Sequence, residues 1–161
     1  MKSYYFVLVA ILGSGCRNDS GPIYGDRAVY GHVSESIQII KSEQIGGSNL
    51  HLVVVENASS TDEQGVPVGK NQIVKADIVA AIEPDATTHL LKTKELNLAF
   101  RFWVYSYVDL NGNGVLDRNE PFGVDAGNPI DVLASESGKV RVGGSTSHKN
   151  YDRALTIDRR Y

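Results

Sequence analysis

The sequence contains a single cysteine, Cys16, and only five prolines in 161 residues. One cysteine excludes an intrachain disulfide, so a fold exported to an oxidising compartment would need another kind of support. Clustered lysines and arginines are missing and the formal net charge is -3, which argues against nucleic-acid binding. No apolar run reaches the roughly 20 residues that a membrane-spanning helix needs. The composition, 42% hydrophobic and 22% charged, is that of an ordinary globular domain.

Motifs of common enzyme classes are missing as well. The chain has no G-x-S-x-G sequence, which marks many serine hydrolases. The segment 65–71, GVPVGKN, ends in Gly-Lys but lacks the spacing and the Ser or Thr of a phosphate-binding loop. The histidines show no pair at zinc-ligand spacing, and we expect each to be a surface or strand residue. They are His32, His51, His89 and His148. We therefore expect the protein not to be an enzyme.

The first sixteen residues have the layout of a secretory signal peptide. One positive residue, Lys2, precedes an apolar run over residues 4–12, and small residues lead to Cys16. The segment resembles the signal of bacterial lipoproteins, in which this cysteine becomes the lipidated first residue of the mature chain. The alternative is an ordinary cleaved signal with an incidental cysteine. The expected division is a signal peptide over 1–15, a lipidated cysteine and polar tether over 16–27, and one folded domain over 28–161.

Short β-type runs alternate with turn formers through the rest of the chain. Apolar residues follow no sustained helical period, and the eight tyrosines and sixteen glycines fit an all-β protein with many turns. We expect a single antiparallel β-sandwich. The segment 72–82 fits a strand or a short helix, and 58–71 and 83–95 are expected to be surface loops. The candidate strands are 28–34, 36–42, 50–57, 96–110, 138–144 and 153–159.

The segment 96–110 has the strongest strand pattern. One face carries Phe100, Phe102, Val104 and Val108, and the other carries Arg101, Trp103, Tyr105 and Tyr107. If Trp103, Tyr105 and Tyr107 are exposed, they form an aromatic strip able to bind a protein or glycan partner. The alternative is that another element covers this face of the sheet.

The twelve residues from Asp109 to Glu120 have the ligand spacing of a calcium-binding EF-hand loop. In such loops oxygen ligands occupy positions 1, 3, 5, 7, 9 and 12, and glycine occupies position 6. The ligand positions are held by Asp109, Asn111, Asn113, Val115 through its carbonyl, Asp117 and Glu120. Gly114 stands at position 6, where a positive φ is needed. The sequence therefore predicts a Ca²⁺ site, with Leu116 holding the loop against the domain.

No helix is expected on either side of this loop. The entering segment has the two-residue period of a strand, and Pro121 disfavours helical conformation at Glu120. We therefore expect one Ca²⁺ that holds a long connection between two strands, with the affinity of extracellular modules, on the order of 10⁻⁴ to 10⁻³ M. The alternative is that N-G-N-G at 111–114 is a hairpin turn without a metal.

The stretch 104–123, VYSYVDLNGNGVLDRNEPFG, resembles a signature of transthyretin-like β-sandwich modules in exported bacterial proteins. These modules are also described as prealbumin-like or carboxypeptidase regulatory-like, and the signature reads D-x-N-x-N-G-x-x-D-x-x-E-P-x-G. The resemblance implies that a strand leads into the loop. It also implies that the module serves binding, adhesion or stabilisation rather than catalysis.

Together these patterns indicate a non-catalytic, calcium-binding lipoprotein of the cell envelope whose β-sandwich binds a protein or glycan partner. A purely structural subunit of an envelope assembly is the second hypothesis, and an envelope enzyme is the third. Arg17 follows Cys16, in place of the aspartate that often retains lipoproteins at an inner membrane. We therefore expect lipid anchoring to the outer membrane.

Overall fold

The structure, a computed structural model, describes residues 29–40, 45–98, 101–132, 147–148 and 150–161. These residues form an all-β protein with fourteen strands and no helix. The part of the chain that is described accordingly offers no helix with the length and apolar character to cross a membrane. Cys16 with the expected signal peptide, the candidate strand 138–144 and Phe100 lie outside the described residues.

The largest sheet has six strands, and all its pairings are antiparallel. In order it contains β14 (Arg159–Arg160), β10 (Pro121–Val124), β9 (Arg101–Asp109), β3 (Asn49–Glu56) and β6 (Ile73–Ala81), and β11 (Ile130–Asp131) also pairs with β9. The centre is the pair β3–β9, which runs in continuous register from Asn49 opposite Asp109 to Glu56 opposite Phe102. Valines and aromatic residues dominate these two strands and favour the extended conformation.

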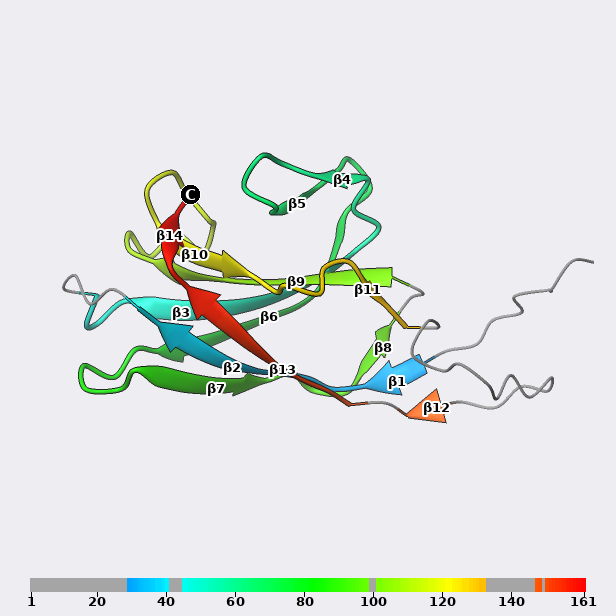
Figure 1. Cartoon of the computed structure of the whole chain (residues 1–161), viewed down its shortest axis with the longest axis horizontal. Helices are drawn as coiled ribbons and strands as arrows, with labels where there is room; N and C mark the ends of the chain where they lie inside the picture. Colours follow the sequence, from blue (N-terminus) through cyan, green and yellow to red (C-terminus); the bar gives the residue numbers. More distant parts are fainter. Residues whose placement is uncertain (1–28, 41–44, 99–100, 133–146, 149) are drawn as a thin grey trace, which may run out of the picture.

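A second sheet consists of β13 (Tyr151–Ile157), β2 (Val33–Ile39) and β7 (Thr88–Lys92). β2 pairs antiparallel with β7 but parallel with β13, so this sheet is mixed, whereas the sequence predicted antiparallel pairing throughout. Two smaller sheets contain β12 (Ser147–His148), β1 (Val29–Gly31) and β8 (Leu96–Leu98), and β4 (Ser60–Thr61) and β5 (Pro67–Val68). Figure 1 shows the six-stranded sheet above the β13–β2–β7 sheet, with the β4–β5 hairpin on top.

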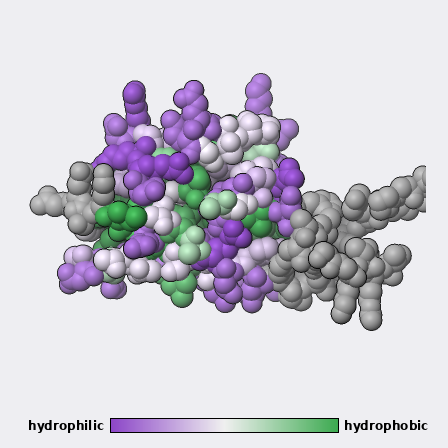
Figure 2. All heavy atoms as spheres, in the orientation of Figure 1, coloured by the Kyte–Doolittle hydropathy of each residue, from purple (hydrophilic) through white to green (hydrophobic). Residues whose placement is uncertain are grey.

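The main core lies between these two layers. Its fully buried side chains come from both sheets, for example Leu52 and Val104 from the upper layer and Ile37 from the lower one. Each such side chain contributes roughly 1.5–3 kcal/mol through removal from water. In Figure 2 the apolar side chains show mainly in the middle of the view, and strongly hydrophilic ones project from its upper margin. Two sheets around one core are compatible with a β-sandwich.

A smaller apolar cluster covers the outer face of the six-stranded sheet. It contains Val53, Val55, Val66, Tyr107 and Phe122. Trp103 is 7% exposed and Tyr107 is 2% exposed, while Tyr105 is partly buried. Most of the aromatic face of β9 is therefore buried, in agreement with the alternative that another element covers this face of the sheet.

Several predicted element boundaries need correction. The segments 28–34 and 36–42 were expected as two strands with a break at residue 35, but β2 runs unbroken through Glu35. The segment 72–82 is a strand, β6. The segment 58–71 contains the short hairpin of β4 and β5, and the expected surface loop 83–95 contains β7.

Candidate metal centre

The predicted calcium loop connects two neighbouring antiparallel strands. β9 ends at Asp109 and β10 begins at Pro121, so strands and not helices flank the loop, as the sequence predicted. Leu116 packs against the outer apolar cluster, as expected for the residue at position 8 of the loop. The loop thus lies at the end of the β9–β10 hairpin, with one apolar side chain directed to the sheet.

Asp109, at position 1, is 3% exposed and binds the backbone of the loop that follows it. Its Oδ1 accepts hydrogen bonds from the N–H groups of Gly112, at 2.6 Å, and Asn113, at 3.3 Å. Its Oδ2 accepts from the Gly114 N–H at 2.8 Å. Burial raises the pKa of Asp109, but these three N–H donors, together with the nearby His51, outweigh burial and hold the pKa below its usual range. The carboxylate is therefore kept in its charged form.

Two glycines allow the chain to wrap around this carboxylate. Gly112 has φ +76° and Gly114 has φ +73°, values that side-chain-bearing residues adopt only at a cost. No other atom lies within 4 Å of a Cβ placed at either position, so conformation and not space requires glycine there. The positive φ expected at position 6 is confirmed.

The middle of the loop is linked by side-chain hydrogen bonds. Asn111 Oδ1 accepts the Asn113 N–H at 3.0 Å, and Asn113 Oδ1 accepts the Val115 N–H at 2.8 Å. The amide nitrogens of the two asparagines both donate to Asp117 Oδ2, at 2.9 and 2.6 Å. An amide oxygen has two lone pairs, so each asparagine retains one for a further ligand.

Glu120, at position 12, connects the end of the loop to its beginning. Its side chain is 3% exposed; Oε1 accepts the Leu110 N–H at 2.8 Å and Oε2 accepts the Asp117 N–H at 2.9 Å. Within the described residues, no lysine or arginine forms an ion pair with Glu120, Asp117 or Asp109. The loop therefore holds two buried carboxylates without a lysine or arginine beside them.

A buried histidine that the sequence did not single out lies next to the loop. His51, on β3, stacks on Tyr107 with ring centroids 4.6 Å apart. Its Nδ1 lies 2.9 Å from Asp77 Oδ1 and must donate, because a carboxylate oxygen only accepts. Its Nε2 is buried and lies 3.7 Å from Asp109 Oδ2. Only the register of β3 with β6 and β9 brings these four residues together, so local sequence carries no signal for the contact.

The six predicted ligands lie on one loop, and hydrogen bonds to side-chain oxygens link all six. The carboxylates alone do not form a metal-holding group, and the described residues contain no group of three or more His, Cys, Asp or Glu able to hold a metal. A cation would therefore need the oxygens of Asn111 and Asn113 and the carbonyl of Val115 as well. Carboxylate, amide and carbonyl oxygens on a glycine-containing loop suit Ca²⁺ better than Zn²⁺.

No protein-family model, no curated protein and no solved structure matches this chain. The resemblance to transthyretin-like modules therefore rests on residues 104–123 and on the all-β architecture.

Proposed function

We propose that this chain is a non-catalytic, calcium-stabilised module of the cell envelope, built as a single transthyretin-like β-sandwich. The observation that carries the proposal is the pair of buried carboxylates, Asp109 and Glu120, each 3% exposed and without a lysine or arginine partner among the described residues. Backbone N–H groups already hold Asp109 in its charged form, and a close counter-charge would stabilise buried carboxylates further. Bound Ca²⁺ would supply that charge and hold the β9–β10 connection in a protein that lacks disulfides.

The chain's own contribution is to arrange the oxygens before the ion arrives. The N–H groups around Asp109 hold this carboxylate charged and in place. Glu120 accepts the Leu110 N–H, so the last ligand is tied to the residue that directly follows the first ligand. The proposed ligands are Asp109, Asn111, Asn113, Val115, Asp117 and Glu120.

Calorimetric titration with Ca²⁺ tests the site. The wild type should bind one ion with a Kd on the order of 10⁻⁴ to 10⁻³ M. The double variant Asp109→Asn, Glu120→Gln should bind no ion measurably, because both buried charges are lost. Asp85→Asn is the matched control, since Asp85 is exposed in the turn between β6 and β7 and should leave the titration unchanged. Equal binding by the double variant would rule out this site.

The proposed role includes contact with a protein or glycan partner. Because Trp103 and Tyr107 are covered, exposed apolar groups on the loop support this contact better: Leu110 is 43% exposed and Val115 is 58% exposed. The alternative is a purely structural subunit, with ion and lipid serving only stability and position. Pull-down from envelope extract with wild type and with Leu110→Ser, Val115→Ser separates the two, since only a binding role predicts a captured component that the variant loses.

The proposed anchor is a lipid on Cys16, with the chain held at the outer membrane. It is supported by the apolar run 4–12 that precedes the cysteine. Growth in labelled palmitate should label the wild type, and Cys16→Ser should lose the label. A labelled Cys16→Ser variant, or an unlabelled wild type, would contradict the anchor without touching the Ca²⁺ proposal.

A further inference from the structure

Residues 159–161 close over the exit of the metal loop. β14 pairs with the first residues of β10, and the pairing continues past the strand end. The Tyr161 N–H donates to the main-chain oxygen of Glu120 at 3.0 Å, and the Asn119 N–H donates to the main-chain oxygen of Tyr161 at 2.8 Å. Arg160 Nη1 donates to the main-chain oxygen of Asn119 at 2.6 Å. Loop positions 11 and 12 are therefore held from outside the loop.

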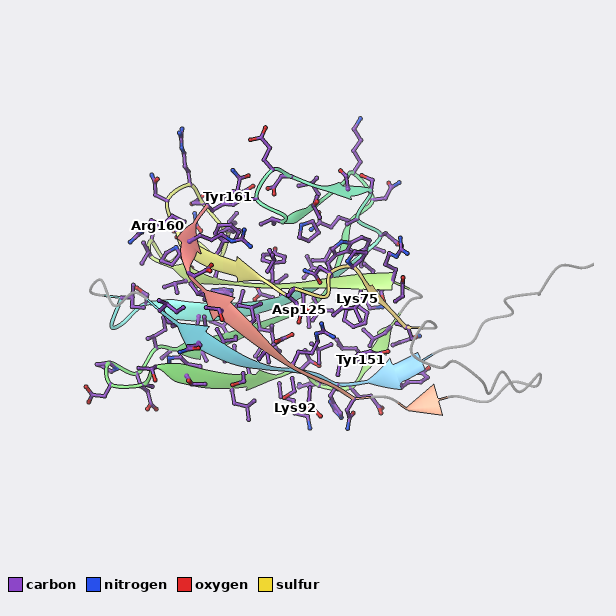
Figure 3. The ribbon with its side chains drawn as sticks, viewed as in Figure 1. Lys75, Lys92, Asp125, Tyr151, Arg160 and Tyr161 are labelled. Atoms are coloured by element: carbon purple, nitrogen blue, oxygen red, sulfur yellow. The ribbon has the colours of Figure 1, made fainter. Side chains whose placement is uncertain are left out.

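This closing segment is also fixed by side-chain contacts. The Tyr161 hydroxyl donates to Asp62 Oδ2 at 2.7 Å, and the Tyr161 ring meets the Phe122 ring edge-on with centroids 5.5 Å apart. Asp62 Oδ1 accepts the Val66 N–H at 2.9 Å, so the hydroxyl joins the closing segment to the β4–β5 hairpin. Figure 3 shows Tyr161 and Arg160 at this end of the six-stranded sheet.

The contacts fall on a backbone conformation that needs support. Asn119 has φ +73°, which costs a non-glycine residue about 1 kcal/mol or more, although asparagine tolerates it better than most. Both main-chain polar groups of Asn119 are bound by the closing segment. The next residue is Glu120, whose buried carboxylate turns toward Leu110 and Asp117. Without the closing segment, Asn119 could relax and Glu120 would lose its inward orientation.

We propose that residues 159–161 form a latch that orients Glu120 for Ca²⁺, so that docking of the latch and Ca²⁺ binding reinforce each other. This inference rests on the proposed Ca²⁺ site. Glu120 stands at position 12, where the ligand is a bidentate carboxylate in EF-hand loops. Binding weakens when a ligand must be ordered at the moment of binding. By linkage, Ca²⁺ favours the docked latch by the same factor by which the latch favours Ca²⁺.

Two variants of one residue separate the contacts of the latch. Tyr161→Pro removes the N–H that Glu120 accepts as well as the hydroxyl, and Tyr161→Phe removes only the hydroxyl bonded to Asp62. Titration with Ca²⁺ should show a Kd raised about 5-fold or more for Tyr161→Pro and by a smaller factor for Tyr161→Phe. Tyr30→Phe, in β1 within a different sheet, is the matched control and should keep the wild-type Kd. In the wild type, Ca²⁺ should also slow hydrogen exchange at the amides of Asn119 and Tyr161.

The outcomes distinguish the latch from the metal site. A wild-type Kd in both variants, with exchange at Asn119 and Tyr161 independent of Ca²⁺, overturns the latch and leaves the Ca²⁺ site intact. A wild type that binds no Ca²⁺ overturns the proposed function and the latch together. If Tyr161→Pro does not fold, Tyr161→Phe and the exchange measurement still decide.

Discussion

Gly123 of β10 packs directly against the main chain of Thr156 of β13, so closely that a Cβ on Gly123 would overlap the main-chain oxygen of Thr156. The same Cβ would lie 2.9 Å from Leu155 Cδ2. Gly123→Ala should therefore push the layers apart and lower the free energy of unfolding by roughly 1–3 kcal/mol, the usual cost of overpacking. Chemical denaturation measures this change.

The control for Gly123 is Gly46→Ala. A Cβ on Gly46 would lie 3.9 Å from Pro84 Cγ, which is ordinary contact, so this variant should be near neutral. Equal unfolding free energies for Gly123→Ala and Gly46→Ala would show that β10 and β13 do not approach each other this closely at Gly123.

Arg153 forms an ion pair with the buried carboxylate of Asp125 between the two layers. Its Nε lies 2.5 Å from Asp125 Oδ2, and Asp125 is almost completely buried at the centre of the molecule (Figure 3). Arg153→Ala leaves this carboxylate buried without its cation and should cost about 3–5 kcal/mol of unfolding free energy. Arg101→Ala breaks a pair of comparable geometry with Asp131, but that pair is exposed and the loss should be much smaller. Urea denaturation measures the loss of unfolding free energy in both variants. A larger loss for Arg101→Ala than for Arg153→Ala would contradict the prediction.

Glu35 should make the protein less stable as pH rises. It is fully buried on β2, and no donor among the described residues reaches either carboxyl oxygen. Burial, aided by the charge of Asp125 and by the hydrogen bond that a protonated Glu35 can donate to Asp125, and opposed by Arg153, raises its pKa to about 8. The ordinary value is about 4.5, so between pH ~4.5 and about 8 the folded state binds a proton that the unfolded state has released. Stability from this group is complete below pH ~4.5 and is lost as pH rises through about 8.

The substitution Glu35→Gln isolates this effect. The variant should equal the wild type near pH 4 and exceed it at pH 9, where the wild type must bury a carboxylate. Unfolding free energies at pH 4, 7 and 9 measure the difference, with Glu83→Gln on the exposed turn as the control. A wild type and a Glu35→Gln variant with parallel pH profiles would show that Glu35 does not retain its proton in the fold.

Substitution of Gly114 should lower the free energy of unfolding because of its positive φ, and not because of a steric clash. Its φ is +73° and its surroundings are open, so Gly114→Ala should cost about 1–2 kcal/mol of unfolding free energy. Gly114→Asn should cost less, because asparagine adopts positive φ more readily. Thermal denaturation in calcium-free buffer compares them. A less stable asparagine variant would mean that the added volume, and not φ, is the problem.

Regular alternation made parts of the fold predictable. β3 and β9 were expected from their valines and aromatics, and Phe102, Val104 and Val108 do form a buried face. β7 was not predicted because the polar residue His89 is buried and the apolar residue Leu90 is exposed, the reverse of the usual arrangement in a strand. The false break in β2 arose at Glu35, a charged residue on a core-facing position. The parallel pairing of β13 with β2 joins segments far apart in sequence and leaves no local pattern.

The conformation of the loop 109–120 was predictable to the extent that its contacts are local. The hydrogen bonds that Gly114 donates to Asp109 and that Asn113 donates to Asp117 join residues at most five positions apart, so ligand spacing encodes them. The contacts of His51 and Tyr161 with the loop depend on strand register and on the docking of β14. Such contacts exist only in the folded sheet, and a single sequence does not display them.

Thermal denaturation with Ca²⁺ and with chelator shows whether the ion stabilises the fold. At 10 mM Ca²⁺ and a Kd of roughly 10⁻⁴ to 10⁻³ M, the ion should add about 1.4–2.7 kcal/mol of stability. That corresponds to a Tm about 3–10 °C higher than in chelator, and the double variant Asp109→Asn, Glu120→Gln should show no difference. An identical Tm of the wild type in 10 mM Ca²⁺ and in chelator would contradict the account.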